Sequence, residues 1–196
     1  MVNAIICDLG EVLVNGFMGV EKRLAELTGL PVTNQQLQTK HLHQFFKGKI
    51  SEEALWRSVN RILGQNLPVE TLMEMVRRNF TEVPGTKRII REVRETGIPC
   101  TILSVHGKEW VEYIEKEHKI SMLFNSMHFS YKMKVMKPDQ RAFELAAESL
   151  RCDPHHCLVI DDSPRNIEVA NNLSFQTHLF VGAKKLREDL RRRNVI

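Results

Sequence analysis

Short apolar runs rich in β-branched residues recur along the chain, and each has the length and composition of a buried β-strand. The runs cover residues 4–7, 98–103, 157–160 and 177–181, with a weaker one at 127–130. Helical patterns separate the later runs, at residues 84–97, 108–118, 138–150 and 163–173. Proline and glycine bracket the first of these helices, and Ser163 followed by Pro164 is typical of a helix start. Strands alternating with helices predict an α/β fold, with a doubly wound, mostly parallel sheet covered on both faces.

The first predicted strand does not fit this alternation, because no helix-then-strand pair follows it directly. Residues 15–83 contain no convincing strand but several helical patterns, at residues 20–29, 34–46, 51–64 and 69–80. The simplest interpretation is a helical cap subdomain, residues 15–83, inserted into an α/β core made of residues 1–14 and 84–196.

Composition and charge narrow the class of protein. The chain has 196 residues, 42% of them hydrophobic and 27% charged, which is ordinary for a globular protein. No apolar stretch approaches the roughly 20 residues of a membrane helix, and Asp8 and Glu11 interrupt the only candidate for a secretory signal. We therefore expect a soluble, cytoplasmic protein with no membrane partner. Its four cysteines lack paired spacing and are expected to be free thiols.

Two local clusters of residues raise the question of zinc binding and of nucleic-acid binding, and neither is the preferred interpretation. Residues 152–157, CDPHHC, contain zinc-ligand residue types, but there is no second cluster to complete a site. The basic segment at residues 184–193 raises the question of nucleic acid, yet Leu186 and Leu190 are spaced as on the buried side of an amphipathic helix. We expect no nucleic-acid partner, and the mild net charge of +4 favours a small anionic substrate.

Unusual polar residues stand where the predicted strands end. Asp8 follows the first strand, Ser104 follows the second, and Asp161 and Asp162 follow the strand at 157–160, while Lys137 precedes a helix. Each has an ordinary explanation alone, such as turn formation or helix capping. Ligands of parallel sheets bind outside the carboxyl ends of the strands, so these residues are expected to converge. Carboxylates with a lysine predict a Mg²⁺ site that binds phosphate.

Four segments, in this order along the chain, resemble the motifs of the haloacid dehalogenase superfamily of hydrolases. They are ICDLGEVLV, TILSV, the lysine of MKPDQRAF, and LVIDDSPRNIEVA. The segment FFKGKISEEALW is similar to cap segments of bacterial sugar-phosphate phosphatases and of the N-terminal domain of soluble epoxide hydrolases. The resemblance implies a Rossmann-like core with an inserted cap, and a Mg²⁺-dependent phosphatase acting on a small phosphorylated metabolite, with a sugar phosphate as one candidate.

The resemblance also implies a role for each matching residue. Asp8 is expected to be the nucleophile that forms an aspartyl-phosphate. Ser104 and the amide of Val105 are expected to bind the phosphoryl group, and Lys137 to neutralise charge.

The same resemblance implies a Mg²⁺ site. Its expected ligands are Asp8, the carbonyl of Gly10 and Asp162, with Asp161 acting through water. Asn166 is expected to lie just outside this group and to support it.

The sequence departs from the family pattern at two positions. Gly10 stands where most phosphatases of the family have a second aspartate, whose side chain protonates the leaving oxygen. Glycine can supply the carbonyl but not the acid, and the loss of a general acid typically costs about 10²- to 10⁴-fold in rate. Glu11 is one candidate replacement. Val105 replaces the usual asparagine of the second motif, keeping the amide but not the polar side chain.

These departures keep two alternatives open. A 2-haloacid dehalogenase needs no acid for its leaving halide, but it leaves the Asp161–Asp162 pair without a purpose. A binding or regulatory module with this fold accounts for the missing acid, but not for the retention of Asp8, Lys137 and Asp162.

The predicted cap supplies candidates for substrate contact and for association. Phe17, His43, Phe46 and Lys47 are aromatic or basic and are possible substrate contacts. Phe46 and Trp56 also suit the core of the helical bundle, which is the preferred interpretation for both. A helical cap also offers a surface for a homodimer.

Overall fold

The computed structural model describes residues 1–196 and contains one five-stranded sheet in the order β3-β2-β1-β4-β5. All pairings are parallel, and the central strand β1 pairs with both β2 and β4. The strands are β1 (Ala4–Cys7), β2 (Cys100–Ser104), β3 (Ser126–Phe129), β4 (Cys157–Asp161) and β5 (Gln176–Leu179). The predicted α/β class with a parallel sheet is therefore confirmed, and all five predicted strands exist within a few residues of their expected bounds.

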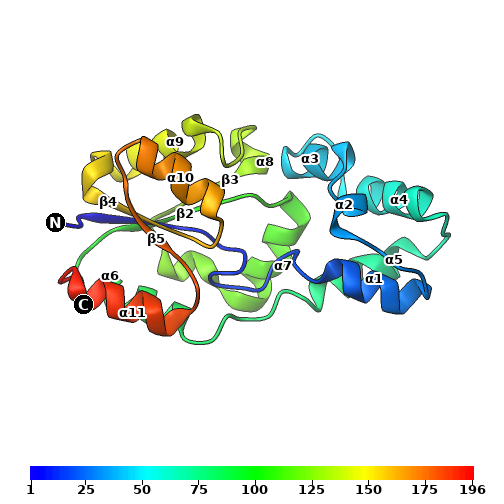
Figure 1. Ribbon diagram of the computed structural model, residues 1–196, viewed down its shortest axis with the longest axis horizontal. Helices are drawn as coiled ribbons and strands as arrows, with labels where there is room; N and C mark the ends of the chain where they lie inside the picture. The colour runs from blue at the N-terminus through cyan, green and yellow to red at the C-terminus, as the bar shows by residue number, and fades with distance from the viewer.

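Helices cover both faces of the sheet (Figure 1). On one face lie α9 (Gln140–Leu150) and α10 (Pro164–Asn172), and on the other lie α6 (Thr86–Glu95), α7 (Lys108–His118) and α11 (Ala183–Arg192). The alternation of side chains in β1 divides the core accordingly: Ala4 and Ile6 pack with the α9 side, whereas Ile5 and Cys7 pack with the α6 side. Leu186 and Leu190 of α11 are fully buried, as the spacing predicted.

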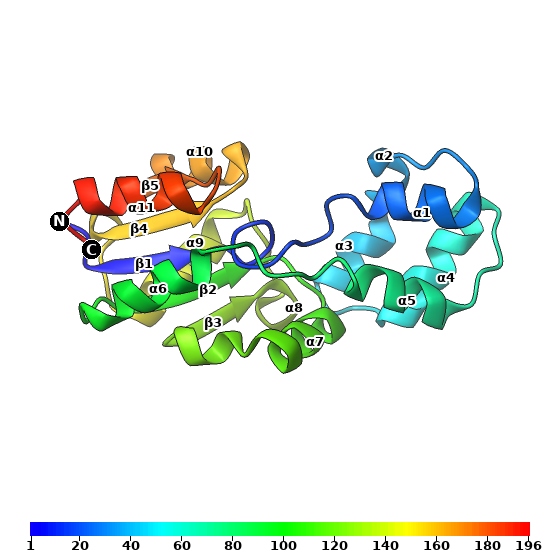
Figure 2. The same cartoon turned by 90° about the horizontal axis from the view of Figure 1, so that it is seen from below.

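Five helices follow β1 before the chain reaches α6 and β2, and Figure 2 shows these five grouped beyond one end of the sheet. They are α1 (Val20–Thr28), α2 (Asn34–Leu37), α3 (Lys40–Phe46), α4 (Glu52–Leu63) and α5 (Val69–Arg77). We refer to this group as the cap helices. The arrangement agrees with an inserted cap, while the exact division at residues 15–83 stays a prediction.

The predicted helix at residues 34–46 is in fact two helices, because two threonines each begin one. The Thr33 side chain accepts a hydrogen bond from the Gln36 amide, and the Thr39 side chain accepts one from the Leu42 amide at 3.1 Å. Short helical turns at α8 (Ser130–Met133), Ile120–Leu123 and Pro154–His156 were not predicted. No helix in this structure combines the length and the apolar character needed to cross a lipid bilayer.

The buried carboxylate of Glu52 joins the cap helices to the core. Its Oε1 accepts hydrogen bonds from the indole N–H of Trp56 at 3.2 Å and of Trp110, on α7, at 3.0 Å. Its Oε2 pairs with Arg77 at 2.7 Å. Burial raises the pKa of Glu52, and these hydrogen bonds and Arg77 oppose that rise. A charge buried with several partners fixes the position of α4 relative to α7.

A second junction depends on a glycine. Phe45, fully buried at the end of α3, packs directly on the backbone of Gly107, which precedes α7. A Cβ atom at position 107 would lie 2.0 Å from a carbon of the Phe45 ring, so no other residue fits without a shift. One continuous cluster of 37 buried residues extends from the cap helices into the α6 side of the sheet.

We expect Gly107→Ala to lower the free energy of unfolding by about 2 kcal/mol, since overpacking a rigid contact carries that cost. Phe45→Ala is expected to cost about 3–5 kcal/mol through the cavity it leaves. The double variant is expected to cost less than the sum, because the cavity accommodates the new methyl group. Urea denaturation of the four proteins tests this, and strictly additive costs would contradict the proposed contact.

Candidate active site

The polar residues at the strand ends come together because their strands are neighbours. β1 lies between β2 and β4, so Asp8, Ser104 and Asp161 stand at adjacent strand ends. Figure 2 shows that these carboxyl ends point toward the cap helices. The site therefore lies between the sheet and the cap helices, where ligands of parallel sheets bind.

Lys137 is the centre of this group. Its Nζ lies 2.8 Å from Oδ2 of Asp8 and 2.5 Å from Oδ2 of Asp161. The side chains of Lys137 and Asp161 are 3% and 1% exposed, while that of Asp8 is 11% exposed and lines the pocket. Burial alone would lower the pKa of Lys137, but Asp161 and Asp8 outweigh it and raise that pKa above its ordinary value. Lys137 is therefore a permanent cation at neutral pH.

The remaining oxygens of the two paired carboxylates also have partners. Oδ1 of Asp8 accepts a hydrogen bond from the Leu9 amide at 2.7 Å. Oδ1 of Asp161 accepts hydrogen bonds from the Ser163 amide and from the side chain of Asn166, both at 2.9 Å. Both oxygens of Asp161 are thus occupied.

Asp162 differs from its neighbours, because its half-buried side chain has no such set of partners and lines the pocket. Carboxylate oxygens of Asp8, Asp161 and Asp162 all lie within 4.8 Å of one another. Burial, and then the charges of Asp8 and Asp161, raise the pKa of Asp162 to about 6. Three carboxylates facing one ammonium leave uncompensated negative charge, and an all-oxygen donor set of this kind suits Mg²⁺. The residues present fit such an ion.

The pocket over this group has a volume of about 350 Å³. Of the residues expected at the site, Asp8, Gly10, Ser104, Val105, Lys137, Asp162 and Asn166 all line it. Asp161 lies behind Lys137 and is fully buried. The turn after Asp8 is closed by Glu11, whose Oε1 accepts a hydrogen bond from the Gly16 amide at 2.7 Å.

Aromatic side chains form the outer wall of the pocket. Phe17 and Phe46 line it as expected, and Phe17 stacks on Trp110 with ring centroids 5.4 Å apart. Phe46 is only partly buried: it packs against the core cluster, as predicted, but it also lines the pocket, whereas Trp56 is fully buried as predicted.

Two of the expected cap contacts do not reach the pocket. His43 is exposed, and neither it nor Lys47 lines the cavity. Residues three apart lie on the same side of a helix, so periodicity alone does not separate the exposed His43 from the partly buried Phe46. The sequence analysis also missed the lining residues Met18, Gln38, His106 and Trp110.

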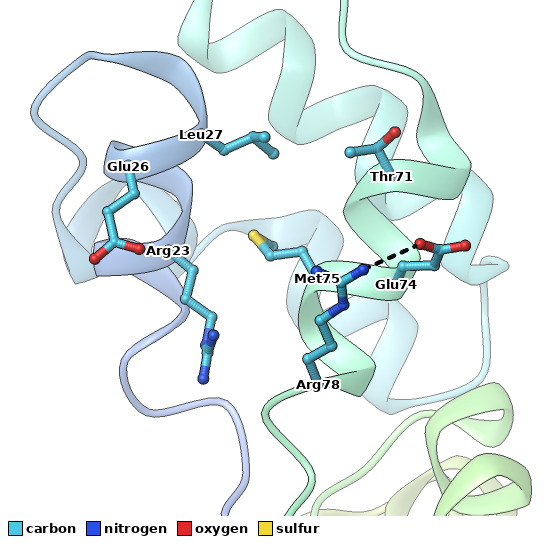
Figure 3. A pocket seen from close by; sticks show the side chains of 7 residues that line it. All are labelled: Arg23, Glu26, Leu27, Thr71, Glu74, Met75 and Arg78. Carbon is cyan, nitrogen blue, oxygen red and sulfur yellow. Dashed lines mark ion pairs between the residues drawn. The ribbon is translucent and has the colours of Figure 1, made fainter.

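A second cavity, of about 310 Å³, lies between α1 and α5 (Figure 3). Its charged side chains are Arg23, Glu26, Glu74 and Arg78, all exposed, and Arg78 pairs with Glu74 at 3.7 Å. It contains no buried charge and no cluster of potential metal ligands. The chemistry of the molecule is therefore concentrated in the pocket at the strand ends.

Comparison with known proteins relates this geometry to a family. The family model described as haloacid dehalogenase-like hydrolase matches residues 5–180. The chain is 27% identical over 165 residues to flavin mononucleotide hydrolase 1 of Arabidopsis thaliana, covering 83% of this chain and 66% of the relative. It is 28% identical over 146 residues to a probable pseudouridine-5'-phosphatase of Drosophila melanogaster, covering 71% of this chain and 61% of the relative. The match thus spans just under two thirds of each relative.

A solved structure shares the fold. It is a HAD family enzyme of Bacteroides thetaiotaomicron in complex with magnesium and inorganic phosphate. The two chains are 21% identical with a TM-score of 0.77, over 91% of this chain and 93% of the other. The likeness covers the cap helices as well as the sheet.

Asp162→Asn is expected to stabilise the metal-free protein at pH 7.5. The raised pKa of about 6 means that ionised Asp162 destabilises the folded state above pH 6, and that this effect fades as the pH falls toward the ordinary value of 3.8. Because the side chain is half exposed, solvent screening reduces the gain to about 1 kcal/mol.

Urea denaturation in the presence of a chelator, at pH 7.5 and pH 4.5, measures this gain, which should shrink at the lower pH. Asp153→Asn is the matched control, since Asp153 is exposed and precedes β4 at the opposite end of the strand. A variant that is less stable than the native protein at pH 7.5 would contradict the electrostatic account.

Proposed function

Because the chain belongs to the haloacid dehalogenase-like hydrolase family, we propose that it is a Mg²⁺-dependent phosphoric monoester hydrolase acting on a small phosphorylated metabolite. One observation carries the proposal: Asp8 faces the pocket while its charge is held by a buried lysine, next to a free carboxylate, Asp162. The fully buried Lys137–Asp161 pair holds this arrangement rigidly.

The proposed reaction has two steps. An oxygen of Asp8 bonds to phosphorus while the bond to the leaving oxygen breaks, giving an aspartyl-phosphate and an alkoxide that takes its proton from water. Water then bonds to phosphorus, the bond to Asp8 breaks, and inorganic phosphate leaves. Lys137 supplies positive charge where the phosphoryl oxygens gather, and Ser104 and the amide of Val105 supply hydrogen bonds to them. Holding the nucleophile at a strand end fixes its line of attack.

The proposed Mg²⁺ ligands are Asp8, the carbonyl of Gly10 and Asp162, all of which line the pocket. Asp161 is proposed to act indirectly, which agrees with both of its oxygens having protein partners. Bound Mg²⁺ would neutralise the carboxylate cluster and polarise the phosphoryl group. The Bacteroides enzyme described above binds magnesium and inorganic phosphate, and this supports the proposal.

The pocket favours a substrate with a flat ring. Phe17 and Phe46 present aromatic surface on the side of the cap helices, with the buried Trp110 packed against both, and this surface suits stacking against a base or another ring. The two relatives are named for flavin mononucleotide and for pseudouridine 5'-phosphate, both of which carry such a ring. We therefore propose a phosphorylated ring compound of this kind in preference to a plain sugar phosphate.

The first prediction is phosphate release that depends on Asp8. With a panel of phosphomonoesters and Mg²⁺, the native protein should release inorganic phosphate, and Asp8→Asn should reduce the rate by at least about 10³-fold because it removes the nucleophile. Chelator should abolish the activity. Asp153→Asn, the same change at an exposed position, should leave it unchanged. A native protein without turnover would indicate a binding module instead.

The second prediction concerns recognition of a ring in the substrate. Phe46→Ala should raise KM for flavin mononucleotide or uridine 5'-phosphate about 5- to 20-fold, as expected from losing about 1–2 kcal/mol of stacking and burial. KM for glycerol phosphate, which has no ring, should change less than twofold. Steady-state kinetics on both substrates test this, and an equal change in both would argue against ring recognition.

A further inference from the structure

His106 is a buried residue of the pocket to which the proposed reaction gives no role. It follows β2 by two residues and is 5% exposed, yet it lines the pocket. Its Nδ1 lies 2.9 Å from Oγ of Ser104, and its backbone N–H donates a hydrogen bond to Ser130 at 3.2 Å. The residue is therefore held by one partner at Nδ1 of its ring and by another at its backbone N–H.

The imidazole occupies the space that Gly10 leaves open. A Cβ atom built at position 10 would lie 3.2 Å from Cε1 and 3.8 Å from Nε2 of His106. The ring edge that carries Nε2 thus faces the turn after the nucleophile. Trp110 lies behind the ring, with centroids 6.5 Å apart in an edge-on arrangement. Nε2 of His106 therefore lies close to the space that a side chain at position 10 would occupy.

The hydrogen bond between Nδ1 and Ser104 determines whether Nε2 of His106 is a hydrogen-bond donor or an acceptor. Phosphoryl oxygens of a dianionic ester only accept hydrogen bonds, so the Ser104 hydroxyl must donate when it binds one. Its oxygen then accepts from Nδ1–H, which leaves Nε2 of a neutral ring as an acceptor facing the pocket. Burial, with Lys137 nearby, lowers the pKa of His106 to about 4, which is consistent with a neutral ring.

We propose that His106 positions the hydrolytic water of the second step, with Nε2 accepting a hydrogen bond from that water and Nδ1–H orienting Ser104. This inference rests on the proposed phosphatase function. In the step itself, the water oxygen bonds to phosphorus, the phosphorus–oxygen bond to Asp8 breaks, and both water protons leave with the product as dihydrogen phosphate. His106 orients the water and gains no proton. As an acceptor, Nε2 cannot donate to the leaving oxygen, so the first step does not use it.

The test separates the two steps with p-nitrophenyl phosphate and Mg²⁺ in stopped flow. His106→Asn keeps a polar atom near the position of Nδ1 but none at Nε2, and it should slow phosphate release about 10- to 100-fold, the range expected for a lost positioning contact. Release of p-nitrophenol in the first turnover should stay within about threefold, so a burst close to one equivalent per enzyme should appear. His106→Gln, whose amide reaches the position of Nε2, should recover part of the rate.

The matched control is His128→Asn, since His128 is a half-buried histidine on β3 that does not line the pocket. It should show native kinetics without a burst. Equal slowing of both steps by His106→Asn, or native rates, would overturn the inference, and His106→Gln decides the question if His106→Asn does not fold. Absence of turnover in the native protein, or turnover that survives Asp8→Asn, would instead overturn the proposed function.

Discussion

The ion pair network of Lys137 is the interaction on which the site depends. An ammonium that is 3% exposed stands between Asp8 and Asp161, at 2.8 and 2.5 Å. Such a group is stable only while its partners remain, because a buried charge without compensation costs several kcal/mol. The strand order supplies that compensation, since Asp8 and Asp161 follow neighbouring strands. The strand order of the sheet therefore determines which charges surround Lys137. Asp162 is the one carboxylate of the cluster that does not pair with Lys137.

The sequence predicted most of this architecture because the relevant signals are local. Apolar runs marked all five strands, and Ser163 with Pro164 marked the start of α10, where the Ser163 side chain accepts from the Asn166 amide. The two threonines that divide residues 34–46 were missed, since Thr39 has no glycine or proline beside it to mark a break in the helical segment.

The limits of sequence reasoning appear where contacts are tertiary. The convergence of Asp8, Ser104 and Asp162 followed from the rule that parallel strands end at one edge. His106 gave no such signal, because its proximity to Gly10 depends on the packing of two loops. The cap residues show the same limit: His43 and Phe46 are three positions apart on α3, yet Phe46 lines the pocket and His43 is exposed, a difference that the sequence does not indicate.

Several side chains of the pocket wall come from a different part of the chain than the charged groups do. Phe17, Met18, Gln38 and Phe46 all come from the stretch between β1 and α6, whereas the charged groups follow strands of the sheet or, for Lys137, precede α9. Substitutions in that one stretch can therefore change the shape of the pocket wall while the charged groups at the strand ends stay intact. A different shape of this wall then requires changes mainly between β1 and α6, with Gly107 and Trp110 as the contact points of the core that the altered segment must still satisfy.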